Sequence, residues 1–227
     1  MEPLVVIMAG GRGLRLHPLT DSAPKPMLRV GDKPLLETII EGFARQDLKR
    51  FVLAVHYRHQ LIEDYFGDGD RLGVRIKYIR ETEPLGTAGA LREVRTDQSF
   101  IVSNADIIAD VDYTDLLRVH AVSGKDATAC LGLHQQQIPF GVAEVREDGT
   151  LTVREKPIEN FNVLAGIYVL PEWAPSTVQG PTDMPDLLAR MKVGTYAIRG
   201  FWMDVGHFES LAIAHFDWSL RLARPAA

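Results

Sequence analysis

The sequence predicts an α/β domain with a doubly wound, mostly parallel sheet and a smaller antiparallel lobe. Apolar strand-like runs alternate with segments of helical periodicity through about the first 125 residues, which is typical of βαβ units. From residue 126 onward, strand-like runs follow one another with few helices between them, and this favours antiparallel pairing. With 227 residues, 46% of them hydrophobic, the chain is long enough for one domain with a substantial core.

The first half begins with the short apolar strand Leu4–Ile7, which ends at a cluster of glycines. Leu36, Ile40 and Phe43 then recur at helical spacing. In chain order, we expect a helix over 34–46, a strand over 51–55, a helix over 60–66, a strand over 74–79, a helix over 87–94 and a strand over 100–102.

The second half predicts strands over 128–133, 141–145, 150–155 and 164–170. A helix after Pro185, a strand over 195–198 and a long helix from about 208 to 222 complete the chain. No internal repeat or linker is visible, so we expect one domain over 1–227. Its parts are a first lobe over about 1–125, a second over about 126–205 and a C-terminal helix over about 206–223.

Composition excludes several classes of protein. A net charge of −5 argues against nucleic-acid binding driven by counterion release. Cys130 is the single cysteine, so neither an internal disulfide nor a cysteine-rich metal site is expected. The N-terminal apolar run is too short for a signal peptide, and no run approaches the ~18 residues of a membrane span. These features predict a cytoplasmic protein without nucleic-acid or membrane partners, and leave its oligomeric state open.

The glycine-rich run Ala9–Gly13 follows the first strand directly. Glycines let backbone N–H groups converge on an anion without Cβ atoms in the way. Arg12, Arg15 and Lys25, which lies between two prolines, add positive charge. The run lacks the Gly-Lys-Ser/Thr of a Walker loop and the third glycine of a dinucleotide fingerprint. We therefore expect a polyphosphate site of another kind.

The glycine run, Pro18-Leu19-Thr20 and Pro24-Lys25-Pro26 together resemble the sugar-phosphate nucleotidyltransferases, and most of all their guanylyltransferase members. The chain departs from the family's opening motif at Leu14, where threonine is usual. The resemblance covers Val5 to about Phe208. It implies a Rossmann-like, GT-A-like nucleotidyltransferase fold, with a nucleotide-binding first lobe and a sugar-binding second lobe.

The resemblance also implies an enzyme and its reaction. A sugar 1-phosphate oxygen attacks the α-phosphorus of a nucleoside triphosphate, giving a nucleotide-diphosphate sugar and pyrophosphate. Arg15, Lys25 and Asp106 would be catalytic, with Arg15 holding the leaving pyrophosphate and Lys25 bridging toward the α-phosphate. The nucleotide-binding residues would be Ala9, Gly10, Gly11, Arg12, Gly13, Glu81, Pro84, Gly86 and Thr87.

Two aspartates are expected to hold a metal ion. Asp106 follows the strand over 100–102, and Asp204 stands in Trp202-Met203-Asp204-Val205-Gly206, which is similar to the Trp-x-Asp-Val/Ile-Gly of the family. The resemblance implies that they bind one Mg²⁺ between them. Mg²⁺ prefers oxygen ligands and is commonly held by one or two carboxylates plus substrate phosphates.

The segment from Glu81 to Gly86 resembles the family's nucleobase loop. An ionised carboxylate only accepts hydrogen bonds, and it can accept them from two parallel donors such as guanine N1–H and N2–H₂. Glu81 therefore favours GTP, while UTP, dTTP and CTP stay open.

Glu155-Lys156-Pro157 matches the family's Glu-Lys-Pro, and implies that the sugar phosphate is bound by Gly141, Glu155, Lys156, Asn162 and Gly166. Leu164 stands where the family commonly has asparagine, and Asn162 lies on the same strand face by alternation. The sugar stays open. Asp183-Met184-Pro185 resembles members that make guanosine-diphosphate sugars for bacterial surface glycans.

Two other functions remain. Asp110-Val111-Asp112 imitates the Asp-x-Asp of glycosyltransferases that consume nucleotide sugars. A non-catalytic nucleotide or sugar sensor is the third possibility. Release of pyrophosphate from GTP, a sugar 1-phosphate and magnesium would distinguish the transferase from both.

Overall fold

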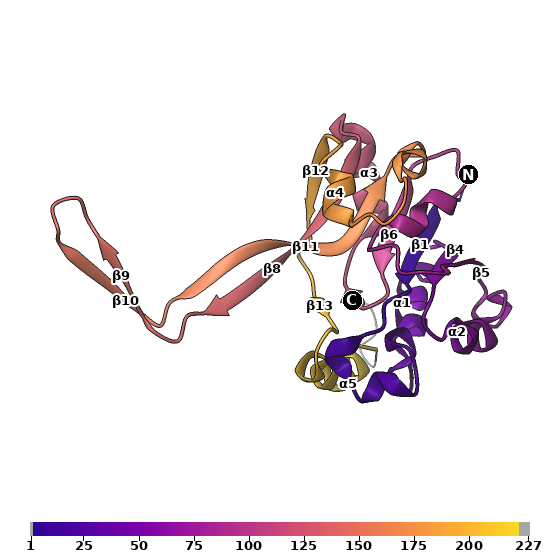
Figure 1. Ribbon diagram of the computed structural model, residues 1–227, viewed down its shortest axis with the longest axis horizontal. Helices are drawn as coiled ribbons and strands as arrows, with labels where there is room; N and C mark the ends of the chain where they lie inside the picture. The colour runs from indigo at the N-terminus through magenta and orange to yellow at the C-terminus, as the bar shows by residue number, and fades with distance from the viewer. Residues whose placement is uncertain (1, 223–227) are drawn as a thin grey trace.

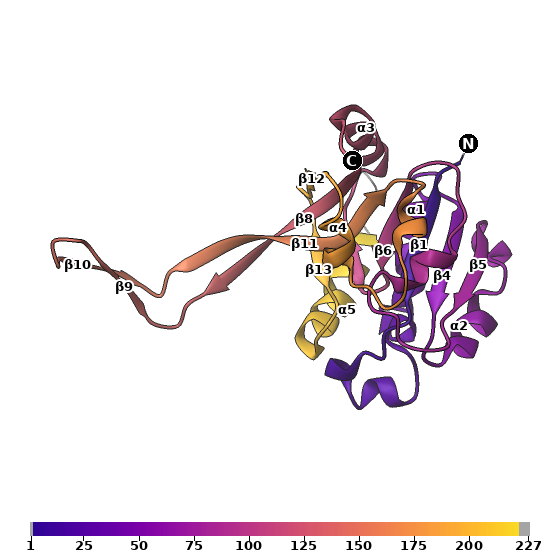
Figure 2. The same ribbon diagram turned by 45° about the horizontal axis from the view of Figure 1, so that its top comes forward.

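The computed structural model describes residues 2–222 of the chain. At its centre lies a seven-stranded sheet (Figures 1 and 2). In spatial order its strands are β12 (Val193–Ala197), β8 (Ala127–Gln137), β11 (Ile158–Leu170), β6 (Phe100–Asn104), β1 (Leu4–Ala9), β4 (Arg50–Val55) and β5 (Arg75–Arg80). β11 runs antiparallel to both of its neighbours, whereas the other adjacent pairs are parallel. The predicted mostly parallel α/β sheet is confirmed.

The helices are α1 (Leu35–Ala44), α2 (His59–Phe66), α3 (Tyr113–Ser123), α4 (Met184–Leu188) and α5 (Phe208–Leu222). Three two-stranded sheets complete the fold: β2 (Arg29–Val30) with β3 (Lys33–Pro34), β7 (Ile107–Ala109) with β13 (Trp202–Asp204), and β9 (Gly141–Val145) with β10 (Leu151–Glu155). Among residues 2–222, none of the helices has the length and apolar character needed to cross a membrane.

One prediction of local structure was wrong, and one helix was not predicted. The helix expected over 87–94 is a shorter 3₁₀ helix, Gly89–Glu93, in which Leu91 N donates to Ala88 O and Val94 N donates to Leu91 O, each three residues back. Helix α3 was not predicted, since of its residues only Tyr113 and Leu116 are buried and the apolar periodicity is weak.

The central sheet is covered on both faces. Along β1, Val5 and Ile7 belong to one apolar cluster, with α1 and β4, while Leu4 and Val6 belong to a second cluster on the other face. All four side chains are almost fully buried. A strand buried on both faces reads as a continuous apolar run rather than an alternating one, and this explains the opening sequence.

The antiparallel strands of the second half do not form a sheet beside the first. β8 and β11 join the central sheet, then continue outward together as a two-stranded ribbon that ends in the hairpin β9–β10 (Figures 1 and 2). The inner half of β11, from Ala165 to Leu170, is buried and partly paired with β6. Its outer half is mostly exposed. The apolar run 164–170 thus predicted only the buried half of a longer strand.

Phe43 is the aromatic centre of the cluster under α1, and we expect its truncation to destabilise the fold. Its ring stacks on Tyr113 at 4.2 Å between centroids and meets Phe51 edge-on at 6.1 Å. Phe43→Ala should lower the free energy of unfolding by about 3–5 kcal/mol in urea titrations. The control Val122→Ala, at a side chain 74% exposed, should change it little; equal effects would contradict this description of the core.

Candidate active site

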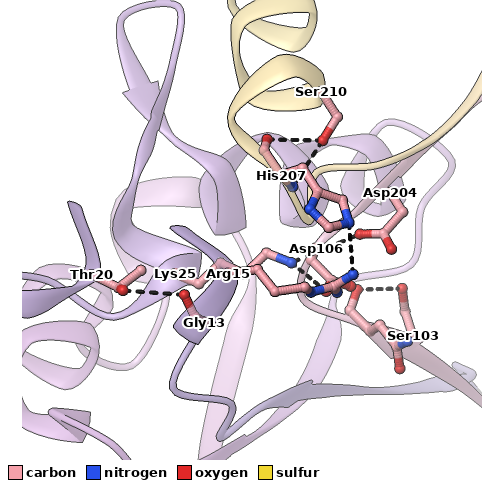
Figure 3. Close-up of polar contacts among 10 residues, drawn as sticks. Gly13, Arg15, Thr20, Lys25, Ser103, Asp106, Asp204, His207 and Ser210 are labelled. Atoms are coloured by element: carbon pink, nitrogen blue, oxygen red, sulfur yellow. Dashed lines mark hydrogen bonds and ion pairs between the residues drawn. The ribbon is translucent and has the colours of Figure 1, made fainter. Parts of the chain in front are cut away.

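Lys25, Asp106 and Asp204 meet beside the loop that follows β1 (Figure 3). The Lys25 ammonium lies 2.6 Å from Asp106 Oδ2 and 3.8 Å from Asp204 Oδ1. Lys25 is only 8% exposed, so these charges interact more strongly than they would in water. Three segments distant in the sequence thus bring two carboxylates and one ammonium together.

Strand pairing explains why the two aspartates converge. Asp106 lies in the turn between β6 and β7, and the N–H of Ala105 in this turn donates to Met8 O at the end of β1. β13 pairs antiparallel with β7 so that Asp204 is opposite Ile107, and the N–H of Val205 donates to Asp106 O. The small β7–β13 sheet therefore places both aspartates at one point.

The charges of Asp106 and Asp204 favour the binding of a further cation. Burial raises the pKa of Asp204, and the Asp106 carboxylate raises it further, against the opposing effect of Lys25 and other nearby cations. The Oδ1 atoms of both aspartates are buried, without a hydrogen-bond partner among the described residues. Oxygen donors of this kind fit Mg²⁺. Within residues 2–222 no group of three or more His, Cys, Asp or Glu side chains could hold a metal, so phosphate or water oxygens would have to complete its coordination.

Arg15 joins this cluster through His207, a residue that the sequence analysis missed (Figure 3). The Arg15 guanidinium donates to His207 Nε2 at 2.9 Å. Because a guanidinium has no acceptor, this imidazole nitrogen must accept. Gly206 lies against Arg15 and Asp204, since a Cβ there would be 2.8 Å from Asp204 Oδ1 and 2.9 Å from Arg15 Nη2. The place of His207 directly after the Trp202–Gly206 motif was the available signal.

Glycine is present at positions 13 and 11 of the loop for different structural reasons. Gly13 has a φ of 65°, and a Cβ there would lie 2.9 Å from Lys25 Cβ and 3.0 Å from Thr20 Cγ2. The Thr20 hydroxyl donates to Gly13 O at 3.1 Å. Gly13 thus lets the loop pack closely against Lys25. A Cβ at Gly11 would meet no described atom within 4 Å, so Gly11 leaves the loop open toward a ligand.

Two other predicted residues flank the loop. Ala9 is the last residue of β1, pairs with Val55 and is 2% exposed. The Arg12 guanidinium lies 5.3 Å from the centroid of the Tyr57 ring, in a cation–π arrangement. Arg12 therefore has a fixed place at the outer side of the loop.

Glu81 lies against the start of the loop. Its backbone N–H donates to Val55 O at 2.8 Å, and His56 Nδ1 contacts its carbonyl at 2.8 Å. A Cβ at Gly10 would collide with the Glu81 carboxylate. Burial raises the pKa of Glu81, and its Oε1 is buried without a hydrogen-bond partner among the described residues. A buried acceptor of this kind needs a donor from a ligand or from water.

The turn that contains Pro84, Gly86 and Thr87 is clamped to the start of α4. The backbone N–H and the hydroxyl of Thr87 both donate to Asp183 Oδ1, at 3.0 and 3.3 Å. Gly86 has a φ of 77°, and a Cβ there would lie 2.6 Å from Thr182 O. The Thr87 N–H is thus already bound to a carboxylate, and the clamp fixes the turn.

The residues predicted to bind the sugar phosphate lie in two separate parts of the structure. Gly166, with a φ of 75°, is near the β6 end of the site, since a Cβ there would lie 2.9 Å from Asn104 Nδ2. Gly141, Glu155, Lys156 and Asn162 instead belong to the projecting ribbon and hairpin. The structure therefore does not bring these four to the aspartate pair, and their role stays a prediction.

Lys156 has a φ of 44°. A side chain in the left-handed region costs roughly 1–2 kcal/mol, and residues held there often belong to functional sites.

Asp112 has a structural role. Its side chain accepts the N–H of Asp115 at 2.9 Å and caps α3. In the Asp-x-Asp sequence of residues 110–112, the second aspartate thus serves as the N-cap of α3.

Several known proteins are similar to this chain. A family model described as "Nucleotidyl transferase" matches residues 4–219. The chain is 35% identical over 219 residues to the mannose-1-phosphate guanyltransferase of Yarrowia lipolytica, and 35% identical over 216 residues to the mannose-1-phosphate guanylyltransferase catalytic subunit beta of Dictyostelium discoideum. Each match covers 88% of this chain and 60% of the relative. The chain thus spans about 60% of the length of these curated relatives.

Among solved structures, the chain is similar to HddC from Yersinia pseudotuberculosis. The TM-score is 0.77 at 24% identity, and the match covers 95% of this chain and 99% of the other. This likeness supports the fold.

The raised pKa of Asp204 predicts that Asp204→Asn stabilises the protein at neutral pH. A carboxyl whose pKa is higher in the folded than in the unfolded state favours folding only while protonated, so its ionisation costs stability as pH rises. We expect the variant to melt at a higher temperature than the unmutated protein at pH 7. The difference should disappear below the ordinary pKa of aspartate, where the carboxyl is protonated in both states.

Asp21→Asn is the matched control for this melting experiment. The Asp21 side chain is 60% exposed and pairs with His17 at the surface, so its replacement should change the melting temperature little. A destabilised Asp204→Asn at pH 7 would contradict the electrostatic description of the site.

Proposed function

Because this chain belongs to the nucleotidyl transferase family, we propose that it condenses GTP with a sugar 1-phosphate to give a guanosine-diphosphate sugar and pyrophosphate. The observation that carries the proposal is the meeting of Lys25, Asp106 and Asp204 beside an open glycine loop. The names of the relatives make mannose 1-phosphate the first sugar to test. A cytoplasmic location is part of the proposal.

Positioning and charge neutralisation carry most of the catalysis in this reaction. Backbone N–H groups at Gly11 and the Arg15 guanidinium hold the β- and γ-phosphates, which leave as pyrophosphate. Lys25 lies deeper, against Asp106, and extends its ammonium toward the α-phosphate. The Arg15–His207 bond fixes the guanidinium before substrate binds. The transfer needs no covalent intermediate on the protein.

Asp106 and Asp204 would hold Mg²⁺ through the two buried oxygens that lack hydrogen-bond partners in the described structure. The bound ion would supply neutralisation of the phosphate charge. Without a cation, two carboxylates beside a triphosphate would repel it, and Lys25 alone cannot balance both.

Glu81 supports guanine as the base. Its Oε1 is buried next to the loop and has no hydrogen-bond partner among residues 2–222, and a carboxylate can accept two parallel N–H donors. Uracil and thymine present one ring N–H between two carbonyls. The second carboxylate oxygen of Glu81 would be repelled by a carbonyl oxygen of these bases.

Pyrophosphate release tests the proposal directly. The protein is incubated with Mg²⁺, mannose 1-phosphate and each of GTP, UTP, dTTP and CTP, and both products are measured. We expect guanosine-diphosphate mannose and pyrophosphate in equal amounts, with GTP preferred. A panel of sugar 1-phosphates then follows. Absence of pyrophosphate release with every pair would refute the proposed function.

Glu81→Gln should reduce the use of GTP more than that of UTP. Loss of two charge-assisted hydrogen bonds weakens GTP binding by roughly 1–3 kcal/mol. The comparison is kcat/KM for both nucleotides in the variant and the unmutated protein. Equal losses would mean that Glu81 does not contact the base.

Asp106→Asn should lower turnover by orders of magnitude, because it removes a carboxylate from the ion and from Lys25. EDTA should abolish the activity of the unmutated protein, and added Mg²⁺ should restore it. The surface variant Asp21→Asn should keep full activity. A variant of Asp106 that turns over normally would remove this residue from the mechanism.

A further inference from the structure

The projecting ribbon and hairpin, residues 132–163, form an arm that leaves the body of the molecule in both views (Figures 1 and 2). Consecutive backbone pairs join its two strands from Leu164–Leu131 to Ile158–Gln137. Ile138 N then donates to Pro157 O, and Lys156 N to Phe140 O, at 3.0 and 3.2 Å. The arm is thus one hydrogen-bonded ribbon out to its hairpin.

One face of the hairpin is apolar and uncovered. Val145 is paired with Leu151, and Ala143 with Val153, so these four side chains share a face. Val145, Leu151 and Val153 are 72%, 59% and 58% exposed. A two-stranded hairpin is marginally stable alone, and contiguous exposed apolar surface is typical of an interaction site.

The opposite face of the hairpin is mostly polar. It carries Thr152 and the ion pair between Arg154 and Glu144, whose atoms lie 3.2 Å apart, and its one apolar side chain, Val142, is partly buried opposite Arg154. Only the apolar face therefore needs a partner.

The apolar face leads to residues predicted for the sugar phosphate. Glu155 is paired with Gly141, and a Cβ at Gly141 would lie 3.1 Å from Glu155 Oε2. Lys156 follows directly. The arm's root at Gly132 packs against Trp202, close to Asp204. Gly141 is nine residues farther along the ribbon, about 30 Å of extended chain. In this conformation the arm holds Glu155 and Lys156 far from their own site.

We propose that a second copy of this chain covers the apolar face, and that two copies exchange arms so that Glu155 and Lys156 of each complete the other's site. The proposal rests on the proposed function, and on the prediction from the sequence that these two residues bind the sugar phosphate. A two-fold exchange buries the same apolar face twice and is a low-cost route to a dimer.

The receiving surface has matching chemistry. Leu14 and Phe208, 72% and 48% exposed, adjoin the bonded Arg15–His207 pair and offer an apolar rim. Lys156 would bring a second ammonium to a site where two carboxylates share Lys25. A sugar phosphate would then lie between the body of one copy and the arm of the other.

Sedimentation equilibrium tests the dimer without relying on activity. We expect the unmutated protein to be dimeric, Val153→Lys to be monomeric, and the matched control Thr152→Lys, on the opposite face of the same strand and paired with Glu144, to stay dimeric. Both positions are exposed, so both variants should fold, as circular dichroism would verify. A monomeric unmutated protein, or equal behaviour of the two variants, would overturn the proposal.

Complementation tests where the arm acts. Lys156→Met and Asp106→Asn should each be inactive as homodimers. A heterodimer of the two, isolated with two affinity tags, contains one intact site and should have about half the unmutated activity. Dimers that recover no activity would show that each arm serves its own site, which overturns the exchange. If the unmutated protein releases no pyrophosphate, the proposed function fails, and sedimentation still decides on the arm.

Discussion

The ion pairs of Lys25 with Asp106 and Asp204 are the constraint on which the rest of the site depends. An almost buried ammonium requires carboxylates nearby, because an uncompensated charge at such a position costs several kcal/mol. The turn after β6 and the β7–β13 pairing supply these carboxylates, because they place Asp106 and Asp204 at one point beside the lysine. Gly13 must be a glycine, since Lys25 occupies the space of its Cβ. One lysine thus contacts segments from both ends of the chain.

The same arrangement leaves the site unbalanced, and this connects stability to function. Two carboxylates share one ammonium, the pKa of Asp204 is raised, and two buried oxygens have no hydrogen-bond partner in the described residues. Burial of the Glu81 carboxylate beside Gly10 follows the same pattern. Groups that cost stability in the free protein are the ones to which ligands can bind, which is why stability and activity often conflict at such sites.

Much of the body of the fold could be predicted because its strands are buried on both faces. Runs such as 51–55 and 100–102 are continuous and apolar, so their position and order are visible in the sequence. The 3₁₀ helix at Gly89–Glu93 was not foreseeable, since the apolar spacing of so short a segment does not distinguish a 3₁₀ helix from an α-helix. The pair Asp106 and Asp204 was found from motifs, whereas His207 was missed because a lone histidine has no metal-ligand spacing, although it directly follows the Trp202–Gly206 motif. The direction of the arm depends on the long pairing of β8 with β11. It could not be predicted, because the apolar run 164–170 indicates only the buried half of β11.

The central claim is that Asp106 and Asp204 share one cation in the presence of nucleotide. Manganese binding, measured by electron paramagnetic resonance with GTP present, tests it in the unmutated protein, Asp106→Asn, Asp204→Asn and the double variant. If one ion is shared, each single substitution should weaken Mn²⁺ binding almost as much as both together. Losses of binding free energy that simply add, or Mn²⁺ affinity that does not change in either single variant, would contradict the claim.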